Sequence, residues 1–255
     1  MLLFAALGVF SGMHFAYSGV ICGMARTEFN VPSPEDLLPL LVRLSATEKF
    51  VIDVGANVGQ TTIPLIEAGA HVLAFEPRPR SCARFVRSIY NAHASKVDFV
   101  CAAVGSAVGV LNFEEAAAST SFAVSTSSRN RFLTVPVVTL ESVLLARGIK
   151  RVDILKTDTQ GYEFQVLVGA GGFLSTIPEI ILEFSYGLLK RAGTDPIQFL
   201  AWLESQNLVC FYMEKRERSG PVPWPIKSGY CPTFSEFSSA LQGGWTNLWC
   251  RHLLD

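Results

Sequence analysis

Short apolar runs alternate along this chain with segments whose apolar residues recur at helical spacing. The runs predict strands at residues 50–54, 71–76, 96–102, 152–157 and 179–184. The segments after them predict helices at residues 60–68, 80–94, 140–147, 163–174 and 196–205. This alternation is typical of βαβ units, whose parallel strands carry helices on both faces of the sheet. Right-handed crossovers make such a sheet doubly wound.

Residues 108–138 interrupt the alternation with two strand-like segments around a stretch of small polar residues. The pattern predicts a hairpin insertion, whose loop is either a solvated connector or a flap over a functional site. Two last strands are expected at residues 208–214 and 246–252. Their long separation favours an antiparallel edge strand that returns beside its neighbour.

The first strand ends in an acid and two glycines, in the sequence FVIDVGANVGQ at residues 50–60. Gly55 can adopt backbone angles closed to other residues, and Gly59 lets a helix and a ligand approach closely. The spacing predicts a strand, a tight turn and a helix start that bind a nucleotide-type ligand. It differs from the G-x-G-x-x-G register of a pyrophosphate loop, which disfavours a dinucleotide.

A second acid, Glu76, ends the next strand and precedes Pro77. In a βαβ unit such an acid accepts hydrogen bonds from ribose hydroxyls, so we expect Glu76 to bind the ribose of an adenosyl cofactor. Acids near helix starts often act only as caps. Two acids at the ends of consecutive strands, Asp53 and Glu76, favour a cofactor site instead.

A third group of polar side chains follows the strand at residues 152–157, where Lys156, Asp158 and Gln160 come in quick succession. Glu183 lies within a later apolar strand, where an unpaired charge would cost roughly several kcal/mol. A partner such as Lys156 would offset that cost, so Glu183 is either half of a structural ion pair or part of the site. Asp158 lies closer to the predicted cofactor edge and is the better candidate for chemistry.

Together, these motifs resemble the FkbM family of S-adenosylmethionine-dependent methyltransferases. The resemblance rests on FVIDVGANVG at residues 50–59, FEP at 75–77, LKTDTQGYE at 155–163 and ILE at 181–183. It covers about residues 50–213, and Gln160 stands where Glu is common in the family. It implies a class I methyltransferase fold: an α/β, Rossmann-like, doubly wound and mostly parallel seven-stranded sheet with an antiparallel edge strand.

The resemblance also implies S-adenosyl-L-methionine as the cofactor. Its methionine portion would be held by Asp53, Gly55, Asn57 and Gly59, and its ribose by Glu76. The full set of expected cofactor-binding residues is Asp53, Gly55, Ala56, Asn57, Gly59, Glu76 and Pro77.

Acceptors in this family are often hydroxyl groups of sugars or natural products, and a hydroxyl loses its proton as it attacks. Asp158 is the expected base, supported by Lys156 or Glu183. We therefore predict an O-methyltransferase that acts on a sugar, a lipid or a small metabolite. Two alternatives share the fold: an NAD(P)-dependent oxidoreductase, which the glycine spacing disfavours, and a non-catalytic, membrane-associated binding protein.

Charged residues make up 17% of the chain and apolar residues 49%, against about 25% charged in typical domains. Residues 1–25 carry no Asp, Glu, Lys or Arg and are long enough to span a membrane. The lack of a basic start favours an uncleaved anchor over a signal peptide, with a buried helix as a further alternative. Basic residues after the segment, such as Arg26, place the catalytic part in the cytoplasm.

The expected organisation is a hydrophobic N-terminal helix at residues 1–25, a connector with a short helix at 26–49 and the methyltransferase domain at 50–255. A net charge of -1 offers no basic field for nucleic acid, which is not an expected partner. The six cysteines form no C-x-x-C pair, so we expect no metal site. We expect buried or idle thiols, although Cys210, Cys231 and Cys250 can meet at one sheet edge.

Overall fold

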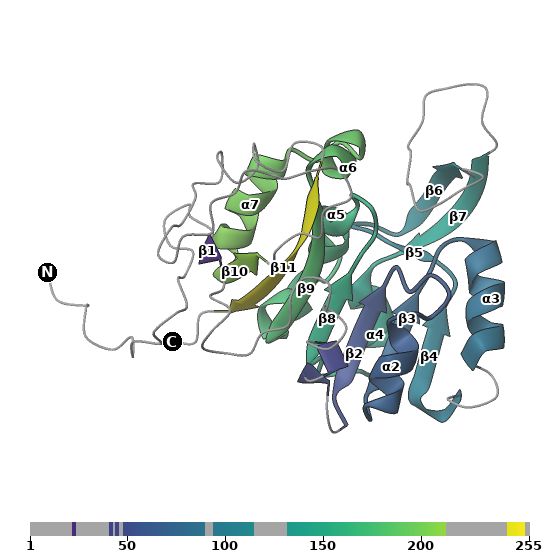
Figure 1. Cartoon of the computed structure of the whole chain (residues 1–255). Coiled ribbons are helices and arrows are strands. Elements are labelled where there is room, and N and C mark those ends of the chain that lie inside the picture. The colour runs from purple at the N-terminus through teal and green to yellow at the C-terminus, as the bar shows by residue number, and fades with distance from the viewer. Residues whose placement is uncertain are drawn as a thin grey trace, which may run out of the picture.

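A mixed β-sheet forms the centre of the molecule (Figure 1). The structure is a computed structural model that describes residues 22–23, 41–42, 44–45, 48–89, 94–114, 132–212 and 244–252. Within these residues the strand order is β1-β10-β11-β9-β8-β2-β3-β4. The strands are β1 (Cys22–Gly23), β2 (Phe50–Val54), β3 (His71–Phe75), β4 (Val97–Val100), β8 (Ile154–Thr157), β9 (Glu179–Ser185), β10 (Leu208–Tyr212) and β11 (Trp245–His252).

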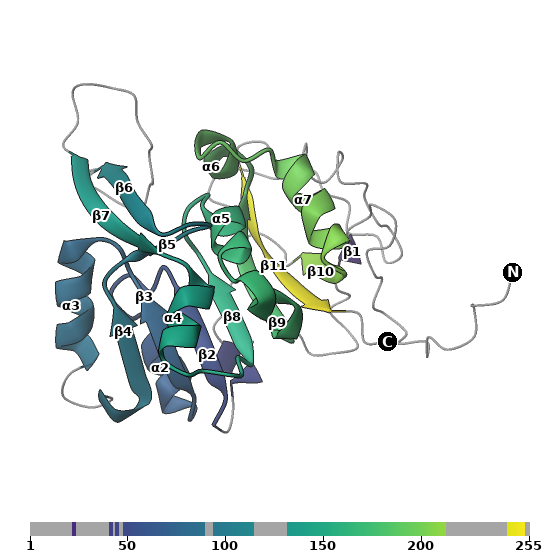
Figure 2. The same cartoon turned by 180° about the vertical axis from the view of Figure 1, so that it is seen from behind.

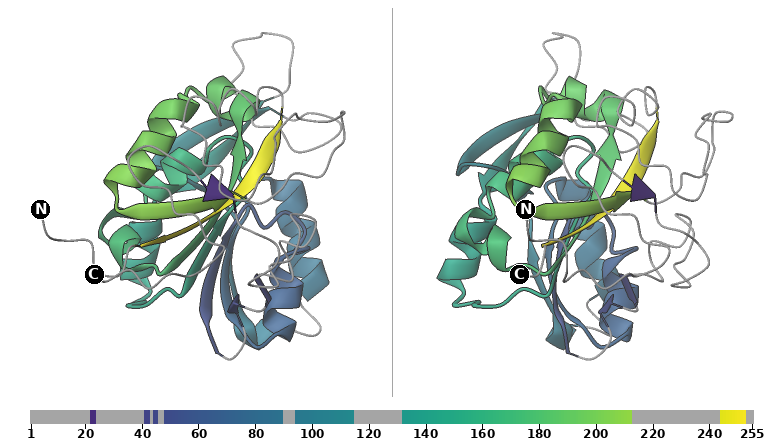
Figure 3. Two further views of the ribbon diagram at one scale, coloured as in Figure 1. Left: turned by 60° about the vertical axis from the view of Figure 1, so that its left-hand side comes forward. Right: turned by 90° about the vertical axis from the view of Figure 1, so that its left-hand side faces the viewer.

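Helices cover both faces of this sheet, as the view from behind and the side views show (Figures 2 and 3). One face carries α2 (Thr62–Glu67) and α3 (Pro79–Ile89). The other carries α4 (Leu140–Ala146), α5 (Glu163–Val168) and α7 (Pro196–Ser205). The remaining helical segments are η2 (Ala94–Lys96), η3 (Gly171–Thr176) and α6 (Tyr186–Arg191).

Alternate residues of the central strands enter two separate cores. In β2, Ile52 belongs to the core that also contains residues of α4, α5 and α7, whereas Val51 belongs to the core with residues of α2 and α3. Successive side chains of a strand point to opposite faces, so a strand covered on both faces must be apolar at nearly every position. This explains the continuous apolar runs in the sequence and agrees with the predicted doubly wound arrangement.

The sheet differs from the predicted one in the place of its antiparallel strand. β11 lies between β9 and β10 and runs antiparallel to both, so it is not an edge strand. The short strand β1 pairs in parallel with the outer side of β10, and the sheet has eight strands among the described residues instead of seven. Hydrophobic alternation determines which residues become strands but not which strands become neighbours, and this is why the prediction was wrong.

The predicted hairpin insertion is confirmed as a second, smaller sheet. β6 (Gly109–Glu114) and β7 (Phe132–Val138) pair antiparallel, and β5 (Ala103–Val104) joins the other side of β7. The loop between β6 and β7 lies outside the described residues, so neither interpretation of it is tested. The predicted helix at residues 163–174 is divided into α5 and η3.

The predicted membrane helix is corrected by the structure. In the part of the chain that the structure describes, no helix combines the length and the apolar character that a membrane crossing needs. Of residues 1–25 only Cys22 and Gly23 are described, and these form strand β1 instead of a helix. The prediction of a membrane-associated protein is therefore wrong, and the cytoplasmic placement, which depended on the anchor, is withdrawn with it.

The expectation of idle thiols is also wrong for four of the cysteines. Cys82 and Cys101 form one disulfide, and Cys210 and Cys250 form another. The second pair joins directly opposed residues of β10 and β11, so these two cysteines do meet, but inside the sheet instead of at its edge. Cys231 lies outside the described residues. Neither pairing was predicted, because residues far apart in the chain are brought together only by the fold.

Candidate functional site

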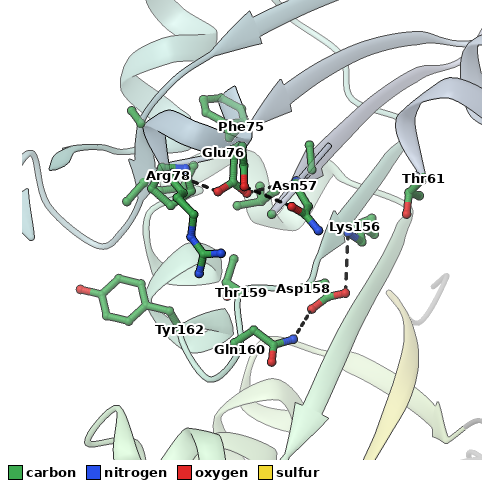
Figure 4. A pocket seen from close by; sticks show the side chains of 18 of the residues that line it. Asn57, Thr61, Phe75, Glu76, Arg78, Lys156, Asp158, Thr159, Gln160 and Tyr162 are labelled. Atoms are coloured by element: carbon green, nitrogen blue, oxygen red, sulfur yellow. Dashed lines mark hydrogen bonds and ion pairs between the residues drawn. The ribbon is translucent and has the colours of Figure 1, made fainter. Parts of the chain in front are cut away.

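A pocket opens at the carboxyl ends of β2, β3 and β8, where ligands bind in open α/β sheets (Figure 4). Its walls come from residues 54–57, residues 75–78, residues 102–104 and the loop that follows β8. Polar side chains from residues 54–57, residues 75–78 and this loop face one shared space.

The turn after β2 is built around Gly55, as the sequence predicted. Gly55 has a φ of +84°, and an added Cβ would lie 2.0 Å from the carbonyl oxygen of Asp158. The backbone N–H groups of Gly55 and Ala56 both donate to the carbonyl of Phe75, at 2.9 Å each. The glycine therefore allows the first loop to touch the loop after β8, and the two donors tie it to the end of β3.

Glu76 occupies one end of the pocket with its side chain almost buried. Its Oε2 accepts the backbone N–H of Asn57 at 3.1 Å, and its Oε1 accepts that of Arg78 at 2.9 Å. Burial raises the pKa of Glu76, and the two backbone hydrogen bonds oppose that rise. Each carboxylate oxygen can accept a second hydrogen bond, so Glu76 can still bind hydroxyl groups of a ligand.

Lys156 lies in the pocket wall between two acids. Its Nζ is 3.0 Å from Oδ1 of Asp53 and 4.0 Å from Oδ2 of Asp158. Burial alone would lower the pKa of Lys156, but the two carboxylates outweigh it and the pKa is raised. Asp53 is fully buried, and its second oxygen accepts the hydroxyl of Thr62 at 2.7 Å.

Gln160 links the acids at the other end of the pocket. Its Nε2 donates to Oδ1 of Asp158 at 2.9 Å and to Oε2 of Glu183 at 3.0 Å. Its backbone has a φ of 60°, a conformation that non-glycine residues seldom adopt. Burial, followed by the neighbouring acids Asp158 and Glu163, raises the pKa of Glu183 to about 9. Glu183 is thus a neutral acid at neutral pH, beside an Asp158 side chain that is 42% exposed.

Glu163 organises the loop that carries these groups. Its carboxylate accepts the backbone N–H and the hydroxyl of Thr159, at 2.7 and 2.9 Å, and the backbone N–H of Gly161 at 2.9 Å. Burial raises its pKa to about 7, against the effect of these donors. This role of Glu163 could not be predicted from its place in the LKTDTQGYE motif, because the donors come from a loop whose path the sequence does not reveal.

The structure brings most of the predicted site residues together. Gly55, Ala56, Asn57, Glu76, Pro77, Lys156 and Asp158 all line the pocket. The other three lie behind its walls: Asp53 below Lys156, Gly59 at the start of α2 and Glu183 behind Gln160. Sequence reasoning missed further lining residues, among them Arg78, Ser81, Ala102, Ala103, Thr159 and Tyr162.

Comparisons with known proteins agree with this geometry. The methyltransferase FkbM domain matches residues 53–209 of the chain. The hexuronic acid methyltransferase AglP of Haloferax volcanii is 26% identical over 164 residues, so the match spans 64% of this chain and only 64% of that relative.

Solved structures show a similar fold at low sequence identity. An rRNA methylase from Streptococcus thermophilus superposes with a TM-score of 0.50 at 10% identity, over 88% of this chain and 99% of that one. This likeness concerns the fold alone, because the identity is too low to carry over a substrate.

Proposed function

Since this chain belongs to the methyltransferase FkbM family, we propose that it transfers a methyl group from S-adenosyl-L-methionine to an oxygen atom of a sugar or another small hydroxyl-bearing molecule. The family resemblance inferred from the motifs is thereby confirmed. The observation that carries the proposal is a single pocket with Glu76 at one end and Asp158 at the other (Figure 4).

Membership of this family implies S-adenosylmethionine as the cofactor, and the pocket residues fit it. Glu76 would accept hydrogen bonds from the two ribose hydroxyls. The apolar wall of Phe75, Ala102 and Ala103 suits a flat purine. At the other end, Asp158 offers a negative charge to a cationic sulfur. Direct contact of Asp53 and Gly59 with the methionine portion stays a prediction, since both lie behind the pocket walls.

When bound, the cofactor supplies a methyl group on a positively charged sulfur, ready for in-line displacement by an oxygen. The protein has to align the acceptor oxygen, exclude water and receive the hydroxyl proton. Asp158 is the base in this proposal, because its carboxylate borders the pocket and is partly exposed. Lys156 and Gln160 hold that carboxylate from two sides, and Glu183 supports it through Gln160.

The proposal of a sugar acceptor is supported by the relative from Haloferax volcanii. Its name, hexuronic acid methyltransferase, supports a sugar acceptor for this chain, although the shared part is only 64% of that protein. A lipid or another small metabolite as the methyl acceptor stays a prediction. That nucleic acid is not the acceptor is also still a prediction, based on the net charge of -1.

Binding of S-adenosylhomocysteine to the full chain is the first test, measured by calorimetry with NAD as the parallel ligand. Glu76→Gln should weaken binding by about 10-fold or more, because hydrogen bonds to a charged group contribute roughly 1.5–3 kcal/mol. The control is Glu204→Gln, on the exposed end of α7. Binding of NAD without S-adenosylhomocysteine would favour the oxidoreductase alternative, and binding of neither would favour a non-catalytic protein.

Turnover is the second test, with labelled S-adenosylmethionine and glucuronic or galacturonic acid as acceptor probes. Asp158→Asn should lower kcat by about 100-fold or more while the affinity for S-adenosylhomocysteine changes little, because general base catalysis contributes roughly that factor. Unchanged turnover in this variant would exclude Asp158 as the base.

A further inference from the structure

The Cys82–Cys101 disulfide joins two walls of the cofactor pocket. Cys82 lies in α3 directly after Ser81, and Cys101 follows β4 directly before Ala102. Ser81 and Ala102 both line the pocket, and the Cα atoms of the two cysteines are 5.9 Å apart. The cross-link therefore fixes the separation of two segments that come from different parts of the chain.

Both ends of this cross-link are connected to the ribose end of the pocket. On the α3 side, the hydroxyl of Ser81 donates to Oδ1 of Asn57 at 3.2 Å, and Sγ of Cys82 lies 3.0 Å from the carbonyl oxygen of Glu76. On the β4 side, the carbonyl of Val100 accepts the backbone N–H groups of Glu76, at 3.2 Å, and of Ala102, at 3.0 Å. Movement of either segment would therefore change the position of Glu76.

The second disulfide is placed differently. Cys210 and Cys250 face each other across paired strands, are almost fully buried and are not among the pocket residues. The backbone hydrogen bonds of β10 and β11 already hold their segments together. Cys101, in contrast, is exposed and can be reached by a thiol in solution. Among the described residues, one cross-link thus lies at the pocket and one is remote from it.

We propose that the Cys82–Cys101 disulfide is a positioning element of the cofactor pocket, and that its exchange with dithiols weakens cofactor binding. The inference rests on the proposed function in one respect, namely that the pocket binds S-adenosylmethionine and its product. It goes beyond that function because it makes the affinity of the site depend on the redox state of its surroundings.

The exchange proceeds in two steps with a dithiol as the reductant. One thiolate of the reductant attacks Sγ of the exposed Cys101, the disulfide bond breaks, and Cys82 leaves as a thiolate that takes up a proton. The second thiol of the reductant, once deprotonated, displaces Cys101, which also leaves and takes up a proton. The cysteine pair gains two electrons and two protons, and the reductant ends as a cyclic disulfide.

Loss of the cross-link frees the segments on both sides of Glu76, and ligand binding must then order them. We expect the dissociation constant for S-adenosylhomocysteine to rise roughly 3- to 10-fold, since ordering side chains and loops on binding lowers affinity by about that factor. Disulfides of this kind persist in oxidising compartments and are reduced elsewhere. The site is therefore expected to bind its cofactor best under oxidising conditions.

The experiment compares S-adenosylhomocysteine binding by calorimetry in the full chain and two double variants. Cys82→Ser with Cys101→Ser removes the cross-link at the pocket, and Cys210→Ser with Cys250→Ser removes the remote one as the control. The first should show the 3- to 10-fold loss of affinity and the second less than a 2-fold change. In the control variant, dithiothreitol should reproduce the loss by reducing Cys82–Cys101, and reoxidation should restore the original affinity.

Equal affinity of the folded pocket variant and the wild type would overturn the inference. If that variant does not fold, unchanged binding by the control variant after complete reduction would overturn it in the same way. Failure of the oxidised wild type to bind S-adenosylhomocysteine would instead overturn the proposed function, so the two failures are distinguishable.

Discussion

The Nζ atom of Lys156 lies 3.0 Å from Oδ1 of Asp53, and both side chains are buried in adjacent parallel strands. The register of β2 and β8 places these two residues opposite each other. The attraction in a buried ion pair offsets the cost of desolvation only when the geometry is close and further hydrogen bonds are made. The hydroxyl of Thr62 supplies one such hydrogen bond, to Asp53. The ion pair therefore holds the side chain of Lys156 in place in the pocket wall.

Lys156→Met should destabilise the protein strongly, because it leaves the carboxylate of Asp53 buried without a cation. We expect the free energy of unfolding in urea at pH 7 to fall by about 3–5 kcal/mol. Lys150→Met, at an exposed position after α4, is the matched control and should leave the unfolding midpoint nearly unchanged. A similar small effect in both variants would show that the buried pair is not a stabilising contact.

Gly55→Ala should disrupt the pocket, because the new Cβ would lie 2.0 Å from the backbone oxygen of Asp158. Backbone at both ends of this clash must move, so we expect a loss of about 1–3 kcal/mol in stability and weaker binding of S-adenosylhomocysteine. Gly187→Ala in α6 is the control, since nothing lies within 4 Å of its Cβ. That variant should be slightly more stable, by up to about 1 kcal/mol, as expected for alanine in a helix. Thermal unfolding and calorimetry check both expectations.

Stability should fall as the pH rises from 7 to 9, because of Glu183. Burial raises the pKa of its carboxyl from 4.5 to about 9. Between these values the folded chain holds a proton that the unfolded chain has released, so the free energy of unfolding decreases with pH. One such group gives a slope of at most ~1.4 kcal/mol per pH unit.

Glu183→Gln should flatten this dependence in urea unfolding measured at pH 7, 8 and 9. The pKa of Glu163 is raised to about 7, so its own effect lies mostly below this window. A slope that stays the same in the variant would assign the pH dependence to other groups.

Gln160→Glu tests the amide that separates two acids. A carboxylate at this position cannot donate to Asp158 and Glu183, and it brings a third acid next to them. The pKa of Glu183 should rise further, and the free energy of unfolding should fall by about 1–3 kcal/mol at pH 8 and by less at pH 6, where the new acid can hold a proton. The control, Asn207→Asp, also replaces an amide at positive φ but is exposed after α7. An equal change in both variants would contradict the role of Gln160.

Local features of the sequence determined many of the elements. The helix predicted at residues 196–205 has the same bounds in the structure, where Asp195 caps its first N–H groups and Pro196 occupies its first turn. Gly55 and Glu76 were assigned correctly to the ends of the first two strands of the site. Such signals involve residues close in the chain, so the sequence alone is enough to read them.

Contacts between distant residues were decided only by the tertiary structure. Lys156 pairs with Asp53, 103 residues away, whereas the sequence suggested Glu183 as its partner. The same holds for the Cys82–Cys101 disulfide and for the place of β11 inside the sheet. Hydrophobic period and turn chemistry specify where a strand begins and ends, but which strands lie side by side depends on how whole apolar faces pack together. The residue types of the pocket were therefore set by the sequence, and their partners by the fold.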